Sequence, residues 1–177
     1  MRYFIGFLIK GEAAEWHNAL TKGISEKFGT WKLHEHVPPH VTVYRPFDTG
    51  DIEPVKNLLE QWAADTDIRG NISLKGYGRF GNKVVFAKVE TDAAIRECLE
   101  KLRGEIGALP HIPPEDFPEW HPHATLAHRL SPQEIIRIWE HVSLLPEPDF
   151  TLPFDNVTLF RHEGDRWVIE ESFYLVK

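Results

Sequence analysis

The feature that most constrains this chain is a short motif that occurs twice, 83 residues apart. The two copies are Pro39-His40-Val41-Thr42-Val43 and Pro122-His123-Ala124-Thr125-Leu126. In a β-strand, residues i and i+2 point to the same side. We therefore expect each histidine to project beside the threonine that follows it, so that each motif presents an imidazole and a hydroxyl together.

The frame around the motif repeats as well. Gly81-Asn82 and Gly164-Asp165 both have the composition of hairpin turns and are also separated by 83 positions. A long loop with prolines precedes each motif, and the expected helices and strands follow the same order in both halves. We predict one bilobal domain over residues 1–177, built from approximate repeats 1–82 and 83–177.

Hydrophobic periodicity and turn residues predict alternating strands and helices along the whole chain. Strands are expected at residues 2–9, 40–44, 71–79, 83–90, 123–127, 154–161 and 166–176. Arg45-Pro46-Phe47 is expected to end the second of these strands. Helices are expected at residues 12–28, 51–64, 92–106 and after Ser131, with Asp51, Asp92 and Ser131 at their N-termini and Gly29 after the first.

The first helix is expected to turn Ala13, Trp16, Leu20, Ile24 and Phe28 inward. The element order predicts an α+β fold of two pseudo-symmetric lobes, each an antiparallel β-sheet backed by helices. The two motif strands should then face each other across a central cleft between the lobes.

Charge and cysteine content narrow the classes of function. The formal net charge is −7 and the pI is about 5.8, which argues against an extended grip on nucleic acid, because such proteins carry a basic face. We expect a small substrate or a nucleic-acid terminus instead. The single Cys98 fits a reducing compartment, and the apolar run Tyr3 to Ile9 is too short to span a bilayer. We expect a cytoplasmic monomer that does not enter a membrane.

The residue types of the motif suit the chemistry of a phosphodiester. Two imidazoles facing one site can accept and donate protons in a concerted way, because their ordinary pKa near 6.5 makes both forms available. Two threonine hydroxyls can donate hydrogen bonds to the oxygens of a phosphate. Attack and departure at phosphorus lie in line, so a base and an acid belong on opposite sides of it.

The two H-x-T-hydrophobic motifs resemble the signature of the two-histidine (2H) phosphoesterase superfamily. The opening Met1 to Ile5 and the segment Arg45-Pro46-Phe47 are similar to its 2′-5′ RNA ligase and cyclic phosphodiesterase group. The resemblance implies metal- and cofactor-independent hydrolysis, or reversible transesterification, of 2′,3′-cyclic phosphates, 2′-5′ linked nucleotides or RNA ends. It also implies that His40 and His123 form the acid–base pair and that Thr42 and Thr125 bind the phosphate.

Five further residues are candidates for substrate binding. Many relatives place an arginine five residues after the second motif histidine, but this chain has His128 there, followed by Arg129. In a regular strand Arg129 would share the side of the motif, so Arg129 or Arg45 is expected to neutralise the phosphate. Tyr77 and Trp120, like Trp31 and Phe47, could stack on a base.

Two other functions remain open at this point. The spacings His34-x-His36-x3-His40 and His121-x-His123 could suit a zinc hydrolase, although we predict no metal. A module that binds cyclic nucleotides or RNA ends without turnover is the other alternative. Neither the identity of the phosphodiester, nor the histidine that acts as base, nor ligation in the cell follows from the sequence.

Overall fold

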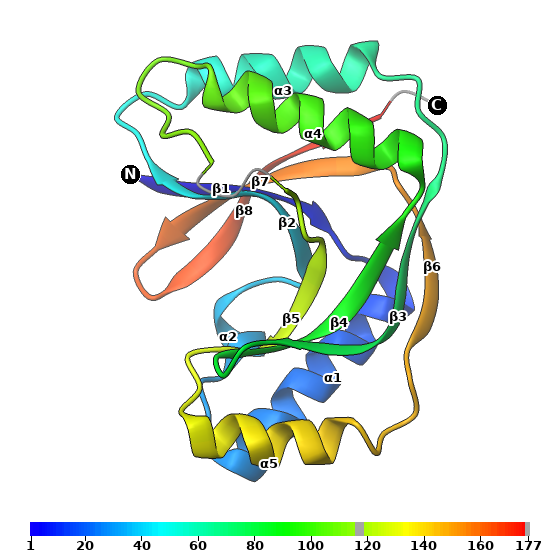
Figure 1. Cartoon of the computed structure of the whole chain (residues 1–177). Coiled ribbons are helices and arrows are strands. Elements are labelled where there is room, and N and C mark those ends of the chain that lie inside the picture. The colour runs from blue at the N-terminus through cyan, green and yellow to red at the C-terminus, as the bar shows by residue number, and fades with distance from the viewer. Residues whose placement is uncertain (116–118, 176–177) are drawn as a thin grey trace.

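The computed structural model describes residues 1–115 and 119–175 and shows two antiparallel sheets with helices packed at both ends (Figure 1). The strands are β1 (Arg2–Leu8), β2 (His40–Asp48), β3 (Asn71–Phe80), β4 (Val84–Thr91), β5 (His123–Ala127), β6 (Asp149–Pro153), β7 (Asn156–Glu163) and β8 (Arg166–Tyr174). The helices are α1 (Gly11–Phe28), α2 (Leu33–His36), α3 (Glu53–Asp65), α4 (Ala93–Gly107) and α5 (Pro132–Val142). This confirms the predicted α+β class.

The two sheets do not correspond to the two halves of the chain. The first sheet has the strand order β2-β1-β7-β8 and the second has the order β5-β4-β3-β6, with antiparallel pairing throughout. Thus β3, from the first half, pairs with β4 of the second half, and β7, from the second half, pairs with β1 of the first. Each predicted repeat contributes to both sheets, and the repeat boundary itself stays a prediction.

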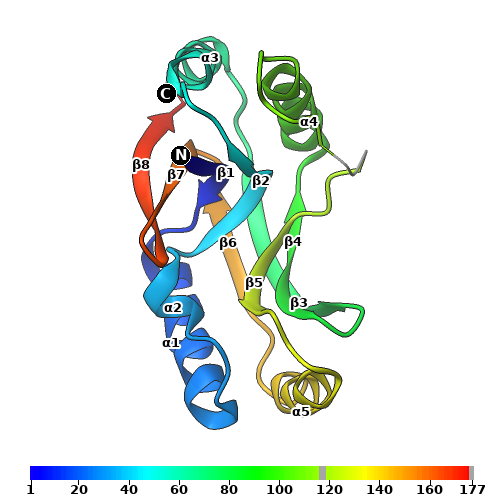
Figure 2. The same cartoon turned by 90° about the vertical axis from the view of Figure 1, so that its left-hand side faces the viewer.

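The helices pack in pairs at opposite ends of the sheets. Helices α3 and α4 lie side by side at one end, and α1 contacts α5 at the other (Figures 1 and 2). Buried side chains of both sheets and of these four helices form one continuous hydrophobic cluster. The two lobes therefore share a core and hold the motif strands against each other.

Strand β1 separates this main core from a smaller apolar cluster on its other side. Tyr3, Ile5 and Phe7 belong to the main cluster, because alternate residues of a strand face opposite sides. Phe4 belongs instead to the second cluster, together with Leu33, Val37 and Phe160. Phe4 and Phe160 of this second cluster also contact the ring of His40, the first motif histidine.

Most of the predicted elements are confirmed, with differences at a few positions. Strand β2 does not end at Arg45-Pro46-Phe47 but continues to Asp48, since a proline is tolerated in an edge strand. Strand β8 ends at Tyr174, and the last residue of the predicted strand, 176, lies outside the described residues. Helix α2 and strand β6 were not predicted.

The helix ends follow local chemistry in three of four cases. Ser131 forms a capping box with Glu134, and Gly29 ends α1 with a φ of 69°. Asp51 accepts a hydrogen bond from the Glu53 N–H at the start of α3. Asp92 makes no side-chain cap; its carboxylate accepts a hydrogen bond from the backbone N–H of Asn71, and so joins α4 to β3.

Helix α1 buries a different face from the one predicted. Ala13 and Ile24 are buried as expected, whereas Trp16, Leu20 and Phe28 are only partly buried. The fully buried positions between them are polar, namely His17, Thr21 and Ser25. A polar face toward the core needs partners, and the partner of His17 belongs to the site described below.

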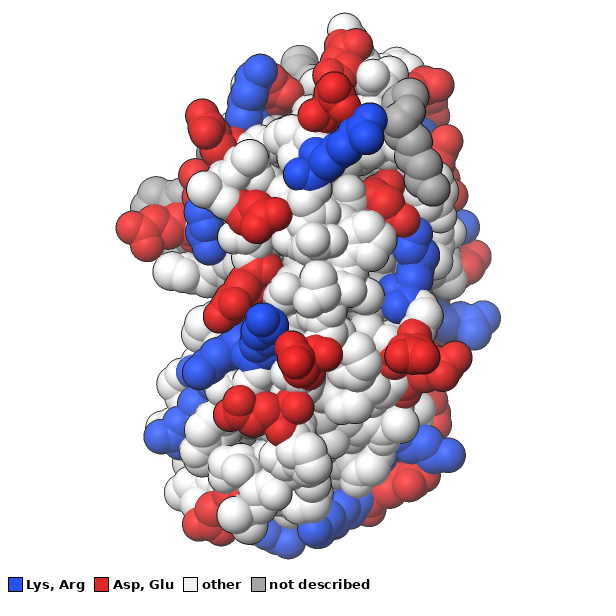
Figure 3. Space-filling model, turned by 90° about the vertical axis from the view of Figure 1, so that its right-hand side faces the viewer, with Lys and Arg blue, Asp and Glu red and all other residues white. Residues whose placement is uncertain are grey.

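Acidic and basic side chains are interspersed on the face shown in Figure 3, as the modest net charge suggests. Among the described residues, no helix is both long and apolar enough to cross a membrane.

Candidate active site

The two motif strands are the edge strands β2 and β5, which lie against each other where the two sheets meet (Figure 2). His40 and Thr42 project from β2, and His123 and Thr125 project from β5. Thr42 and Thr125 line one cavity, so the structure brings both motifs to a common site. The contact between the edge strands β2 and β5 therefore agrees with the prediction that the motif strands face each other.

Both motif histidines are oriented in the same way by their own backbone. Nδ1 of His40 lies 2.8 Å from the carbonyl oxygen of Pro38, and Nδ1 of His123 lies 2.8 Å from that of His121. A carbonyl oxygen only accepts hydrogen bonds, so Nδ1 carries the proton in each neutral ring. Nε2 is consequently the nitrogen that each imidazole has available for proton transfer to or from a substrate.

Each motif histidine also packs against two phenylalanines. The His40 ring centroid lies 4.6 Å from that of Phe4 and 5.5 Å from that of Phe160. The His123 centroid lies 4.8 Å from Phe80 and 5.3 Å from Phe86. These contacts restrain the ring planes and cover part of each imidazole.

The apolar surroundings favour the neutral form of both rings. Burial, together with nearby His17, His123 and His128, lowers the pKa of His40 to about 4, against the opposing effect of the bond to the Pro38 carbonyl. Burial also lowers the pKa of His123, with a further contribution from His121. Without a ligand, both imidazoles are therefore neutral near pH 7.

The larger cavity lies on the His40 side and has a volume of about 580 Å³. Thr42, Thr125 and Arg129 supply polar groups, and Trp31 and Trp167 supply aromatic walls. Its size and its mixture of flat apolar and hydrogen-bonding groups fit a small ligand with a ring system and an anionic group.

A second cavity of about 410 Å³ lies on the His123 side. Its walls include Val43, Phe80 and Trp120, and Thr42 borders both cavities. Thr42 therefore stands between two spaces, one beside each histidine.

The candidate cations lie on different sides of the site. Strand β5 ends at Ala127, so the strand alternation used to separate His128 from Arg129 does not apply, and both side chains line the larger cavity. Arg129 has a φ of 60°, and its guanidinium carbon lies 5.0 Å from the centroid of the Trp31 ring. The His128 ring packs edge-on against the same tryptophan at 4.6 Å.

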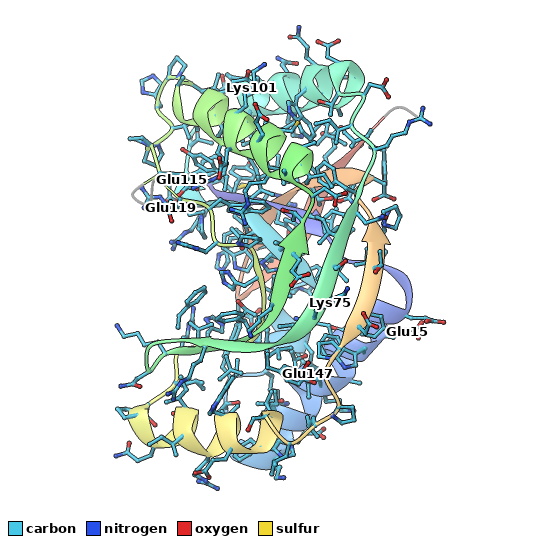
Figure 4. The ribbon with its side chains drawn as sticks, turned by 45° about the vertical axis from the view of Figure 1, so that its right-hand side comes forward. Glu15, Lys75, Lys101, Glu115, Glu119 and Glu147 are labelled. Carbon is cyan, nitrogen blue, oxygen red and sulfur yellow. The ribbon has the colours of Figure 1, made fainter. Side chains whose placement is uncertain are left out.

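Arg45 borders the second cavity and is held by the loop that precedes β5. One of its terminal nitrogens donates to the Pro114 carbonyl at 2.8 Å, and its Nε lies 3.7 Å from a Glu115 carboxylate oxygen. Figure 4 shows Glu115 and Glu119 on this loop. Arg129 is thus the arginine that shares a cavity with both motif threonines.

The proposed aromatic contacts divide into two groups. Trp31 lines the larger cavity and Trp120 the second, although the Trp120 indole N–H is already donated to the Thr42 carbonyl at 2.8 Å. Tyr77 and Phe47 lie in the main core, and the Tyr77 hydroxyl donates to the Pro146 carbonyl at 2.9 Å. Tyr77 therefore lies in the interior rather than where a base could stack on it.

The histidines of the zinc alternative are engaged in other contacts. His36 stacks on Trp31 at 4.7 Å, and its Nδ1 donates to the Asp165 carbonyl at 3.0 Å. Within the described part of the chain, no group of three or more His, Cys, Asp or Glu side chains is arranged to hold a metal ion.

Sequence reasoning missed three residues of the site. His162 and Trp167 belong to the β7–β8 hairpin and line the larger cavity, which strand alternation alone could not indicate. His17 of α1 is 3% exposed, and its Nε2 lies 2.8 Å from the Thr125 carbonyl oxygen. A signal for His17 was present, since His17, Thr21, Ile24 and Ser25 recur at helical spacing beside Ala13.

Known proteins show the same fold over nearly the whole chain. The structure of TT0787 of Thermus thermophilus matches with a TM-score of 0.69 at 23% identity, covering 99% of this chain and 98% of that one. The structure of E. coli LigT complexed with 3′-AMP matches with a TM-score of 0.66 at 15% identity, and the LigT complex with NADP+ with a TM-score of 0.60 at 16%. Both LigT matches cover 99% of this chain and 98% of LigT.

Sequence comparison identifies the family. A protein of Staphylococcus aureus strain Newman, which carries the provisional name phosphoesterase, is 28% identical over 152 residues, covering 81% of this chain and 85% of that protein. The model of the 2′-5′ RNA ligase superfamily matches residues 11–166, which include both motifs. The chain belongs to the 2′-5′ RNA ligase superfamily.

Proposed function

We propose that the protein is a metal-independent phosphodiesterase that acts on a 2′,3′-cyclic phosphate or a 2′-5′ linked nucleotide or RNA end. The observation that carries the proposal is that the two motif histidines have the same orientation and the same tautomer. Each donates Nδ1–H to the backbone two residues upstream, which leaves Nε2 for the reaction. The provisional name of the Staphylococcus aureus relative and the nucleotides in the two LigT complexes support a phosphoester of nucleotide type.

The threonines and Arg129 supply the phosphate site. Thr42 and Thr125 come from different strands to the same cavity, so their hydroxyls can donate to two different phosphate oxygens. Arg129 lines this cavity and offers the charge that offsets the phosphate. Hydrogen bonds to the phosphate that strengthen as charge develops on its oxygens lower the barrier.

The bound phosphate also prepares the acid. Both imidazoles have lowered pKa values in the free protein, whereas a general acid must carry a proton. A nearby anion favours the charged form of an imidazole and raises its pKa. Substrate binding thus brings one proton to the pair.

The unequal cavities orient the substrate. We place the nucleoside in the larger cavity beside His40, because Trp31 and Trp167 give it flat walls there. The leaving oxygen, which belongs to the nucleoside, then lies next to His40, and water approaches from the side of His123. His123 removes a proton from the water as its oxygen bonds to phosphorus, and His40 donates a proton to the oxygen whose bond to phosphorus breaks.

A panel of phosphodiesters assayed in EDTA tests the reaction class. Nucleoside 2′,3′-cyclic phosphates, RNA with a 2′,3′-cyclic end, ADP-ribose cyclic phosphate and 2′-5′ linked dinucleotides would be compared. His40→Ala and His123→Ala should each lower kcat by roughly 100- to 10,000-fold. His141→Ala is the matched control, because His141 lies on α5 and pairs with Lys27.

Three outcomes would contradict the proposal. Turnover that EDTA abolishes and zinc restores would indicate the metal hydrolase. Tight binding without turnover of any substrate would indicate the binding module. Activity that survives both active-site substitutions would exclude the two-histidine mechanism.

The orientation has its own test. A cyclic substrate with sulfur in place of the leaving oxygen needs no general acid, because a thiolate is a better leaving group than an alkoxide. This substrate should restore most of the rate of His40→Ala and little of that of His123→Ala. The reverse pattern would place the nucleoside on the other side.

A further inference from the structure

The backbone carbonyl of each motif threonine accepts a hydrogen bond from an aromatic ring that belongs to the opposite half of the chain. His17, on α1 in the first half, binds the Thr125 carbonyl through Nε2 at 2.8 Å. Trp120, in the loop of the second half, donates its indole N–H to the Thr42 carbonyl at 2.8 Å. The two contacts cross between the halves in opposite directions.

These contacts occur where the motif strands need support. β2 and β5 are edge strands, and an edge strand presents backbone groups that have no partner strand on one side. Such a strand can shift more readily than a central one. The threonine hydroxyls depend on the position of these edges for their aim at the phosphate.

His17 has the properties of a fixed, neutral donor. It is 3% exposed, and burial lowers its pKa to about 4. Because the Thr125 oxygen only accepts, Nε2 carries the proton of the neutral ring. Among the described residues, its Nδ1 has no hydrogen-bond partner. Within the described part of the chain, the bond to Thr125 is thus the hydrogen bond that this buried side chain makes.

Trp120 is part of a larger attachment of its loop to β2. The side chain is 5% exposed. In the same loop, a Glu115 carboxylate oxygen accepts the Arg45 backbone N–H at 2.9 Å, and the Pro113 carbonyl accepts the Tyr44 hydroxyl at 2.6 Å. The described residues of this loop on either side of 116–118 thereby contact the motif strand of the other half.

We propose that His17 and Trp120 are positioning residues, each of which sets one threonine hydroxyl of the site: His17 sets Thr125 and Trp120 sets Thr42. This inference rests on the proposed function, since it concerns the phosphate site. A displacement of about 1 Å at a catalytic group can cost up to roughly 100-fold in rate. The two contacts therefore couple the folding of each half to the chemistry of the other.

Double-mutant cycles on kcat distinguish this role from a general structural one. His17→Leu should lower kcat by roughly 10- to 100-fold in the wild type and in Thr42→Val, but by less than about 2-fold in Thr125→Val, because there the hydroxyl it positions is already gone. Trp120→Phe removes only the N–H and part of the ring. It should lower kcat in the wild type and in Thr125→Val, but by less than about 2-fold in Thr42→Val. His17→Gln, whose amide can still donate, should recover most of the rate.

Residues that merely stabilise the fold would give a different result. His17→Leu and Trp120→Phe would then lower kcat by the same factor in every background, and this would overturn the inference. Failure of the proposed function is a separate outcome, because wild-type protein would then hydrolyse no phosphodiester in EDTA. Circular dichroism of each variant at the assay temperature ensures that folded protein is compared.

Discussion

The buried His17 makes acid stability a quantitative test of the structure. Its pKa is lowered from 6.5 to about 4 in the folded chain because burial disfavours the imidazolium. Between these values the unfolded chain binds a proton that the folded chain does not, so the free energy of unfolding falls as the pH falls. This one residue should remove about 3 kcal/mol of stability by pH 4, at up to about 1.4 kcal/mol per pH unit.

The variant His17→Gln isolates this contribution, since glutamine does not titrate but can keep the bond to Thr125. Urea unfolding followed by the fluorescence of the six tryptophans would be measured from pH 7.5 to 4. The other histidines titrate in both proteins, so their contributions largely cancel in the difference; the effect of His17 on the pKa of His40 is the part that does not. The wild type should lose about 3 kcal/mol relative to the variant across this range. A difference that stays constant with pH would refute the assignment of His17 as a buried neutral imidazole.

Two further predictions concern catalysis and packing. The optimum of kcat should lie at higher pH than that of kcat/KM. The free protein, which kcat/KM reports, has lowered pKa values at His40 and His123, whereas bound phosphate raises these pKa values in the complex, which kcat reports. Coincident pH profiles would contradict this. Gly78→Ala should cost about 1–3 kcal/mol in thermal unfolding and lower kcat, since its Cβ would lie 2.5 Å from the Phe86 ring that packs on His123. Gly23→Ala, whose added Cβ meets no atom within 4 Å beyond its chain neighbours and the nearby backbone of its own helix, should instead stabilise α1 by about 0.5–1 kcal/mol. An equal loss of stability in both variants would argue against the clash at Gly78.

The motif strands and most helix ends were predictable because their causes are local. Alternation placed His40 and Thr42 on one side of a strand, and the Ser131 capping box is contained within four residues. The 83-residue spacing then predicted that the second motif would face the first. Each of these inferences uses only neighbours in the sequence or a repeat of them.

The exchange of β3 and β7 between the sheets was not predictable in the same way. Element order says which strands exist, but the pairing of β3 with β4 and of β7 with β1 depends on the packing of the whole chain. The short α2 and β6 have too few residues for a periodic signal.

The surroundings of the motif depend on similar long-range packing. Arg129 lines the cavity because β5 ends two residues before it, and Trp167 does so because the β7–β8 hairpin lies beside β1. His17 was hidden by the assumption that a helix buries its largest apolar residues. In α1 the buried face contains polar side chains instead, and one of them serves the second motif.

The carbonyl that orients each motif histidine lies only two residues before it, at Pro38 and at His121. In the proposed mechanism, the orienting carbonyl, the proton carrier and the phosphate ligand are thus contained in five consecutive residues of each half. Because the orienting atom belongs to the main chain, it persists whichever side chain occupies that position, and the unit could be copied by a single duplication of the segment. The neutral carbonyl also gives both imidazoles the same tautomer, so under the proposed mechanism the unequal cavities, and not the tautomers, decide which imidazole acts as acid.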